Sequence, residues 1–268
     1  MNGSKPILSI SNLSMHFEGI VALDSVNMEV QKQSITALIG PNGAGKTTLF
    51  NCLTGFYQPT KGDCIFHLDR DFHINQLYFK IFGGTHWLAK AGVARTFQNV
   101  RLFKEMTVIE NCLIAQHIFS HRNLLEGLFN SKRFKKWEQT AILQASNWLE
   151  RFHLLEDANK IAKTLPYGKQ RYLEIARAMC TSPKLLCLDE PAAGLNNHET
   201  HALAQLILSL RSENNVSILI VEHDMSLIMK ISDHIVVLDQ GKVIASDNPL
   251  AIRQNKKVIE AYLGSDYE

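Results

Sequence analysis

The feature that most constrains this chain is a glycine-rich turn over residues 40–47. It has the sequence Gly40-Pro41-Asn42-Gly43-Ala44-Gly45-Lys46-Thr47, and Thr48 follows it. It matches the pattern G-x-x-x-x-G-K-[ST], in which glycines allow consecutive backbone N–H groups to curl around phosphate oxygens. Such a turn lies between a strand and a helix, and the sequence predicts both, over Ile35–Ile39 and about Lys46–Leu53. We therefore predict an α/β protein with a phosphate-binding loop over residues 40–47, and Thr48 as a further nucleotide-binding residue.

Two side chains of this loop carry its expected chemistry. Lys46 is placed to reach the β- and γ-phosphates of a nucleotide, and the hydroxyl group of Thr47 is placed to bind Mg²⁺. The following helix directs the positive end of its dipole toward the same phosphates. A glycine turn without a ligand is the alternative, but the flanking strand and helix favour a site for ATP and Mg²⁺.

Two carboxylates follow a second apolar strand, Lys184–Leu188. Asp189 and Glu190 come directly after it, at the carboxyl end of the strand, where parallel α/β sheets bind ligands. An apolar run that ends in Asp-Glu is a weak signal alone, but the phosphate loop makes it specific. We expect the two acids on a strand next to that of the loop. There Asp189 would hold Mg²⁺, commonly through water, and Glu190 would orient or deprotonate the water that attacks the γ-phosphate.

A third polar group follows another apolar strand. The sequence Val221-Glu222-His223-Asp224 repeats the arrangement of an apolar strand with polar residues at its end. An isolated histidine at such a position is more often a surface or core residue. Here we interpret His223 as a group aimed at the γ-phosphate, and this assignment rests on the resemblance to a known family.

The composition argues against some partners. Of 268 residues, 28 are basic and 26 are acidic, and the formal charge of +2 is too small to indicate a nucleic-acid partner. No apolar run approaches the roughly 18–20 residues that span a bilayer, and the first residues lack the apolar core of a signal peptide. We therefore expect a soluble protein that reaches a membrane only through partners. The cysteines form no C-x-x-C pair and are expected to be buried, reduced thiols. They are Cys52, Cys64, Cys112, Cys180 and Cys187.

A helical segment is expected between the phosphate loop and the acidic strand. Thr107 and Glu110 form a capping box, which predicts a helix that ends near His117. Further helices are expected over Arg133–Phe152 and from Tyr167.

The other elements alternate between strand and helix, which is typical of an α/β core. Between residues 63 and 91 the pattern predicts no boundaries. Strands are expected over Ile7–Leu13, Val26–Val30, Lys184–Leu188, Ser217–Val221, Ile235–Leu238 and Val243–Ala245, and helices over Asn197–Arg211 and Met225–Ile231. A helical subdomain over residues 99–180 thus interrupts a core formed by residues 1–98 and 181–268.

The phosphate loop, the acidic strand end and the strand-end histidine, with a helical insert between the first two, resemble an ABC ATPase over nearly the whole chain. The resemblance implies one P-loop NTPase domain of the ABC ATPase fold, with a RecA-like core, an antiparallel β subdomain and an inserted helical subdomain. It assigns adenine stacking to Phe17. It assigns contact with Mg²⁺ or water to Gln98, in Arg95-Thr96-Phe97-Gln98. It makes Glu190 the catalytic base and His223 the switch histidine.

The segment Leu165-Pro166-Tyr167-Gly168-Lys169-Gln170 occupies the position of the ABC signature, and it departs from the family. Tyr167 and Gly168 are expected to contact the ATP that a partner chain binds. The family usually has a serine where this chain has Pro166. The contact must then rely on the Gly168 amide and the helix dipole, with Lys169 as a further candidate. In the loop after the acidic pair, Asn196 replaces the usual aspartate and removes a charge from the contact between chains.

Several stretches are similar to the LivG-type ATPases of branched-chain amino acid importers. The resemblance implies that the chain hydrolyses ATP as the motor subunit of an ABC importer for amino acids, with branched-chain amino acids the family expectation. The stretches are Tyr167-Gly168, Ala192-Ala193-Gly194-Leu195-Asn196, Arg95 to His117 and Ala261-Tyr262-Leu263-Gly264.

The same resemblance implies several partners. Because the chain has one phosphate loop and one signature, a second ABC ATPase subunit must complete each site, in a homodimer or, as the resemblance favours, a heterodimer. Integral membrane permease subunits are the direct partners at the membrane, and a periplasmic or extracellular solute-binding protein takes part indirectly. The expected location is peripheral, at the cytoplasmic face of the inner membrane.

Three alternatives share parts of this pattern. The ATPase of a lipopolysaccharide-export system is similar in size, but it normally keeps the serine that Pro166 replaces here. A non-transport ABC ATPase of DNA repair or of the ribosome usually carries a long coiled coil or two cassettes, and neither occurs in the sequence. A nucleotide-binding scaffold without turnover is disfavoured by Glu190 and His223.

Overall fold

A six-stranded sheet contains the strands that lead into the phosphate loop, Glu190 and His223. In this computed structural model, which describes residues 5–77, 84–117 and 132–263, its strand order is β10-β9-β3-β8-β7-β6. The strands pair in parallel, except that β10 is antiparallel to β9. Strands β3, β7 and β8 are buried along their whole length, as continuous apolar runs covered on both faces. The strands are β3 (Ile35–Ile39), β6 (Val93–Arg95), β7 (Leu185–Asp189), β8 (Ser217–Val221), β9 (His234–Asp239) and β10 (Lys242–Asp247).

A four-stranded antiparallel sheet, ordered β2-β1-β4-β5, forms the second part of the fold. Its two predicted strands are confirmed but are longer than expected: β1 covers Leu8–Phe17 and β2 covers Ile20–Val30. The register between β1 and β2 shifts three times between Ile10 and His16. Such bulges break the alternation on which the sequence pattern depends. β4 (Lys61–His67) and β5 (Asp71–His73) complete the sheet.

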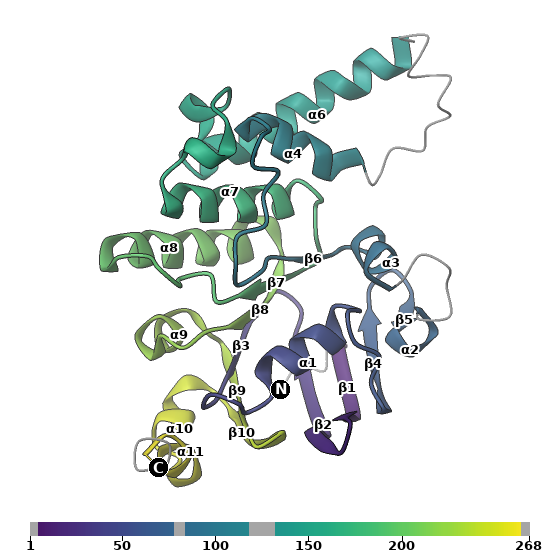
Figure 1. Cartoon of the computed structure of the whole chain (residues 1–268), viewed down its shortest axis with the longest axis vertical. Helices are drawn as coiled ribbons and strands as arrows, with labels where there is room; N and C mark the ends of the chain where they lie inside the picture. Colours follow the sequence, from purple (N-terminus) through teal and green to yellow (C-terminus); the bar gives the residue numbers. More distant parts are fainter. Residues whose placement is uncertain (1–4, 78–83, 118–131, 264–268) are drawn as a thin grey trace.

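Helix α1 (Lys46–Leu53) follows the phosphate loop and lies between the two sheets (Figure 1). Strand β3 and helix α1 have the predicted bounds. The side chains of Leu49, Phe50 and Leu53 are fully buried in an apolar core shared with both sheets. No side chain caps the N-terminus of α1, so its first N–H groups stay available for a phosphate group.

A layer of three helices lies at the top of Figure 1. It consists of α4 (Val108–Gln116), α6 (Lys132–Arg151) and α7 (Tyr167–Met179). The capping box between Thr107 and Glu110 at the start of α4 is present as predicted. The layer shares the larger apolar core with the six-stranded sheet. The exact division of the chain into a core and an inserted subdomain stays a prediction.

Eight further helical elements complete the described part of the chain. β8 and helix α9 have the predicted bounds. No described helix is long and apolar enough to cross a membrane. All five cysteines are buried and none forms a disulfide, as expected. Gly264 of the family-like carboxy-terminal stretch lies outside the described residues. The eight helical elements, of which η2 and η3 are 3-10 helices, are α2 (Ile74–Leu77), α3 (Gly84–Ala91), η2 (Leu155–Asp157), η3 (Ala162–Thr164), α8 (Asn197–Asn214), α9 (Met225–Ile231), α10 (Pro249–Arg253) and α11 (Lys256–Leu263).

The order of the strands corrects one expectation. Asp189 and Glu190 were predicted on a strand adjacent to that of the phosphate loop, but β8 lies between β3 and β7. The reason is that β3 pairs with β8 on one side and β9 on the other, so β7 takes the next place outward. Because β3, β7 and β8 are parallel, their carboxyl ends still meet at one edge, and His223 follows the strand in the middle.

Candidate nucleotide-binding site

A cavity of about 530 Å³ lies at this edge of the sheet. The phosphate loop forms one side, and the ends of β7 and β8 form the other together with residues 96–101, the loop after β6 that we call the Gln98 loop. The lining residues from the loop and helix α1 are Asn42, Gly43, Ala44, Gly45, Lys46, Thr47 and Thr48, and those from elsewhere are Ile20, Val21, Ala22, Gln98, Glu190, His223, Gln240 and Gly241. The predicted catalytic residues Lys46, Gln98, Glu190 and His223 therefore come together around one cavity.

Two glycines of the loop are required by close backbone contacts. A Cβ atom on Gly40, whose φ is +150°, would lie 2.0 Å from the carbonyl oxygen of Leu238. A Cβ atom on Gly45, whose φ is +99°, would lie 2.7 Å from the carbonyl oxygen of Ala22. Both distances are well inside van der Waals contact, so only glycine permits this loop to fold against β9 and β2.

Lys46 is held inside the loop. Its Nζ atom donates hydrogen bonds to the carbonyl oxygens of Gly40 and Pro41, at 2.7 and 2.8 Å. Burial lowers the pKa of Lys46, and the negative charge of Glu190 partly opposes this. A buried ammonium group whose hydrogen bonds go to neutral carbonyls is stabilised when negatively charged phosphate oxygens approach it.

Glu190 is held from two sides. Gln98 donates a hydrogen bond from Nε2 to Oε2 of Glu190 at 2.8 Å, and Nε2 of His223 lies 2.6 Å from Oε1. The backbone of Glu190 has φ of +46°, in the left-handed region that glycine favours. Strained residues of this kind concentrate at functional sites, because the surrounding structure must hold them in place. The geometry thus fixes a carboxylate that faces the cavity.

The three predicted Mg²⁺ ligands line a second cavity of about 330 Å³ beside the first. Thr47 and Gln98 border both cavities, and Asp189 borders the second. Their hydroxyl, amide and carboxylate oxygens are the hard ligands that Mg²⁺ prefers, and Mg²⁺ usually combines one or two protein ligands with phosphates and water. These residues therefore fit Mg²⁺. Burial raises the pKa of Asp189, and a hydrogen bond from Arg95 opposes this.

The position of Phe17 relative to the first cavity bears on the predicted contact with adenine. The ring of Phe17 packs edge-on against Tyr57, with centroids 5.4 Å apart, and Phe17 is not among the residues that line the first cavity. Instead, Ile20 and Val21 line it, and they are 69% and 53% exposed. Neither was predicted from the sequence, although two adjacent apolar residues after a Gly-containing turn are a usable signal. Stacking of adenine on Phe17 stays a prediction.

The signature segment does not border the chain's own phosphate loop cavity. Gly168 lies in the first turn of α7, and a Cβ atom there would lie 2.7 Å from Oε1 of Glu199. Nζ of Lys169 donates a hydrogen bond to Asp157 at 2.6 Å. Lys169 was a candidate for a phosphate contact in place of the missing serine, but its charge is already paired within the chain. Pro166 precedes the helix at its N-cap position.

Glu222 has a role that sequence analysis missed. Its buried carboxylate accepts hydrogen bonds from the backbone N–H groups of Ala192 and His223, at 2.6 and 3.0 Å. Burial raises the pKa of Glu222, and these hydrogen bonds oppose this. Glu222 therefore connects the loop after Glu190 to the histidine loop, and its position beside His223 was the available signal.

Comparisons with known proteins agree with this geometry. Residues 23–193 match the family model described as ABC transporter, and residues 242–268 match the one described as branched-chain amino acid ATP-binding cassette transporter. The chain is 54% identical to the high-affinity branched-chain amino acid transport ATP-binding protein BraF of Pseudomonas aeruginosa, over 97% of this chain and 99% of that protein. It is 52% identical, with the same coverage, to the protein LivG of Escherichia coli K12. An ATP-binding cassette of an ABC transporter, solved in its ADP conformation, is 32% identical, with a TM-score of 0.80 over 97% of this chain and 100% of that one.

The fold and the site define an ATP-binding cassette ATPase. Within that class, the chain belongs to the ABC transporter family, in the group that contains BraF and LivG. It is therefore an ATPase.

Proposed function

We propose that this chain is the ATP-hydrolysing motor subunit of an importer for branched-chain amino acids. The observation that carries this proposal is the identity of 54% to BraF over almost the full length of both proteins. The match of residues 242–268 to a branched-chain amino acid cassette model supports it, because these residues lie outside the general ABC match. The ATPase does not touch the solute, so the choice of solute depends on its partners.

Lys46 binds the β- and γ-phosphates of ATP in exchange for the carbonyls of Gly40 and Pro41. Thr47, Gln98 and Asp189 are the proposed ligands of Mg²⁺, which would stabilise the negative charge of the phosphates when bound. Glu190 orients the attacking water and accepts a proton from it, and His223 stabilises the γ-phosphate end of the site.

A dimer completes the site. The chain's own signature residues, Tyr167 and Gly168, do not border its phosphate loop cavity. We propose that they contact ATP held by a second ABC ATPase subunit, through the Gly168 amide and the positive end of α7. The partner is an identical or a related chain, and the family resemblance favours a related one. Closure on ATP and release after hydrolysis then drive the permease.

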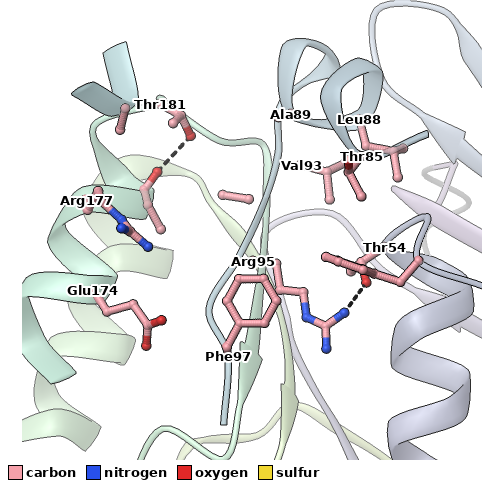
Figure 2. Close-up of a pocket in the computed structure, with 14 residues that line it drawn as sticks. Thr54, Thr85, Leu88, Ala89, Val93, Arg95, Phe97, Glu174, Arg177 and Thr181 are labelled. Carbon is pink, nitrogen blue, oxygen red and sulfur yellow. Dashed lines mark hydrogen bonds between the residues drawn. The ribbon is translucent and has the colours of Figure 1, made fainter. Parts of the chain in front are cut away.

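The proposed contact with the permease is a groove of about 230 Å³ between the helical layer and the core. Figure 2 shows Leu88 and Val93 on one side and the α7 side chains Glu174 and Arg177 on the other. Its walls are mainly apolar, which suits a short helical segment of a membrane protein. Gln98 follows Phe97, which lines the groove, so a segment bound here lies close to the Gln98 loop. The proposed location is therefore peripheral, on the cytoplasmic face of the inner membrane, with a solute-binding protein outside.

Transport by the purified complex tests this proposal. The tagged chain is purified with its membrane partners and reconstituted in vesicles with the solute-binding protein. We expect ATP-dependent uptake of labelled leucine, isoleucine or valine, and no uptake with Glu190→Gln. Assembly with lipopolysaccharide-export permeases, or uptake of none of these amino acids by a complex that hydrolyses ATP, would contradict the proposal.

A further inference from the structure

The side chain of Arg95, the last residue of β6, connects the groove of Figure 2 with Asp189. Its Nη2 atom donates a hydrogen bond to Oδ2 of Asp189 at 3.0 Å. Its Nη1 atom donates to Oδ1 of Asn51 at 2.8 Å and to the hydroxyl of Thr54 at 2.5 Å. Asn51 lies in α1 and Thr54 directly follows it, so this one guanidinium joins the acidic strand to the helix of the phosphate loop.

Three aromatic rings enclose the same guanidinium group. The Cζ atom of Arg95 lies 4.8 Å from the ring centroid of Phe50 and 5.0 Å from those of Phe56 and Phe97. The Arg95 and Asp189 side chains are only 10% and 6% exposed. In such a site the ion pair is weakly screened, and the rings add cation–π attraction. The position of the guanidinium plane is therefore well defined.

This contact determines how Asp189 presents its carboxylate. Because Arg95 occupies Oδ2, the rotation of the carboxylate about its last bond is fixed. Asp189 also borders the cavity that Thr47 and Gln98 share. Partners that orient a metal-binding carboxylate typically change metal affinity or activity by about 10- to 100-fold.

We propose that Arg95 is a positioning residue for the metal site. It holds Asp189 in the orientation that binds Mg²⁺, and it keeps that orientation in register with the phosphate loop through Asn51 and Thr54. This inference rests on the Mg²⁺ site proposed above. The Nε atom of Arg95 is buried without a hydrogen-bond partner among the described residues, and Arg95 lines the groove. A segment that enters the groove therefore contacts the side chain that holds Asp189.

Measurements of metal affinity distinguish a positioning role of Arg95 from a general structural role. We compare wild type, Arg95→Met and Arg95→Lys, with Arg151→Met as a matched control. Arg151 of α6 likewise pairs with a carboxylate, that of Glu213, and lies 5.2 Å from the ring of Trp148, but it lines neither cavity of the site. The binding of Mn²⁺ to the ADP-loaded protein is followed by electron paramagnetic resonance, and the affinity for ATP in EDTA by calorimetry. Thermal unfolding checks that each variant is folded.

We expect Arg95→Met to weaken Mn²⁺ binding by about 10- to 100-fold while the affinity for ATP in EDTA stays unchanged. Arg95→Lys should recover part of the loss, because it restores the charge without the two-pronged geometry. Arg151→Met should bind Mn²⁺ as wild type does. If Arg95→Met fails to fold, a Lys variant with wild-type Mn²⁺ affinity would still overturn the proposal, because a fixed guanidinium plane would then be unnecessary.

Two negative results have different meanings. Tight Mn²⁺ binding by wild type that is unchanged in Arg95→Met overturns the role of Arg95 alone. A wild-type protein that binds ADP but gains no Mn²⁺ affinity removes the proposed metal site, and the role of Arg95 with it.

Discussion

His223 and Glu190 meet across two strand ends, with Nε2 of His223 2.6 Å from Oε1 of Glu190. They are 33 residues apart in the sequence, and β7 and β8 bring them together. Gln98 holds the other carboxylate oxygen. Glu190 therefore has its position fixed by two side chains and by a backbone conformation that an L-residue rarely adopts.

The left-handed backbone of Glu190 gives a stability prediction. Glycine adopts a φ of +46° without strain, whereas alanine does not. We expect Glu190→Gly to be more stable than Glu190→Ala by about 1 kcal/mol, although both lack the carboxylate and turn over poorly. Urea unfolding of the two variants measures the difference. Equal stability would show that the site imposes no strain at this residue.

The burial of Lys46 predicts a loss of affinity on its removal. Lys46→Ala deletes a charged hydrogen-bond donor worth about 1.5–3 kcal/mol, so the affinity for ATP should fall roughly 10- to 100-fold. Calorimetric titration measures it, with Lys32→Ala as a control at an exposed lysine. Unchanged affinity in Lys46→Ala would argue against the phosphate contact.

A fully buried ion pair anchors the Gln98 loop to α7. Arg171 donates to the carbonyl oxygens of Phe97 and Gln98, each at 2.6 Å, and Glu174 accepts from the Arg101 backbone N–H at 3.0 Å. Arg171 and Glu174 are 0% and 1% exposed. Breaking such a pair leaves an uncompensated charge, so Arg171→Met should destabilise the fold by about 3–5 kcal/mol.

A double variant separates the effect of the buried charge from the effect of the lost contacts to the Gln98 loop. Arg171→Met with Glu174→Leu removes both charges and should recover part of the stability. ATP turnover should stay low, because the loop that carries Gln98 has lost its backbone contacts. Denaturant unfolding and an ATPase assay measure the two quantities. Full recovery of turnover in the double variant would contradict the anchoring role.

His234 gives a prediction for pH dependence. Its Nε2 atom lies 2.8 Å from the hydroxyl of Ser246, and burial lowers its pKa below the ordinary 6.5, with Asp247 opposing. The unfolded chain therefore binds a proton at a higher pH than the folded protein does. This difference lowers the free energy of unfolding at pH values below the lowered pKa, and the reduction disappears as the pH rises to 6.5. The free energy of unfolding should therefore increase across that window.

The substitution His234→Gln should flatten this slope, while His198→Gln, at an exposed histidine of α8, should keep it. Urea unfolding at several pH values between about 5 and 7.5 measures the effect. A slope that is the same in His234→Gln and in wild type would contradict the assignment.

Much of the site follows from the sequence because each motif contains both its backbone geometry and its chemistry. The loop with Gly40 and Lys46 requires a strand and a helix at fixed positions, and β3 and α1 have those bounds. Glu190 and His223 follow the strands β7 and β8, whose apolar runs define them. Each of these predictions uses residues that are neighbours in the sequence.

The remainder depends on contacts between distant residues. Arg95 and Asp189 are 94 residues apart, so no local pattern reveals their pairing. The same holds for Lys169, whose partner Asp157 precedes the signature helix in a separate turn. Bulges in β1 likewise hide the strand length, because they shift side chains from one face to the other without a change in composition.

We propose Glu190 as the residue on which turnover depends most. The substitution Glu190→Gln keeps the shape of the side chain and removes the base, and the turnover of ATP and the affinity for ATP are measured on the same preparation. We expect affinity like that of wild type with turnover reduced about 10²-fold or more. Turnover at the wild-type rate would show that another group activates the water, and Glu190 would lose its assignment as the catalytic base.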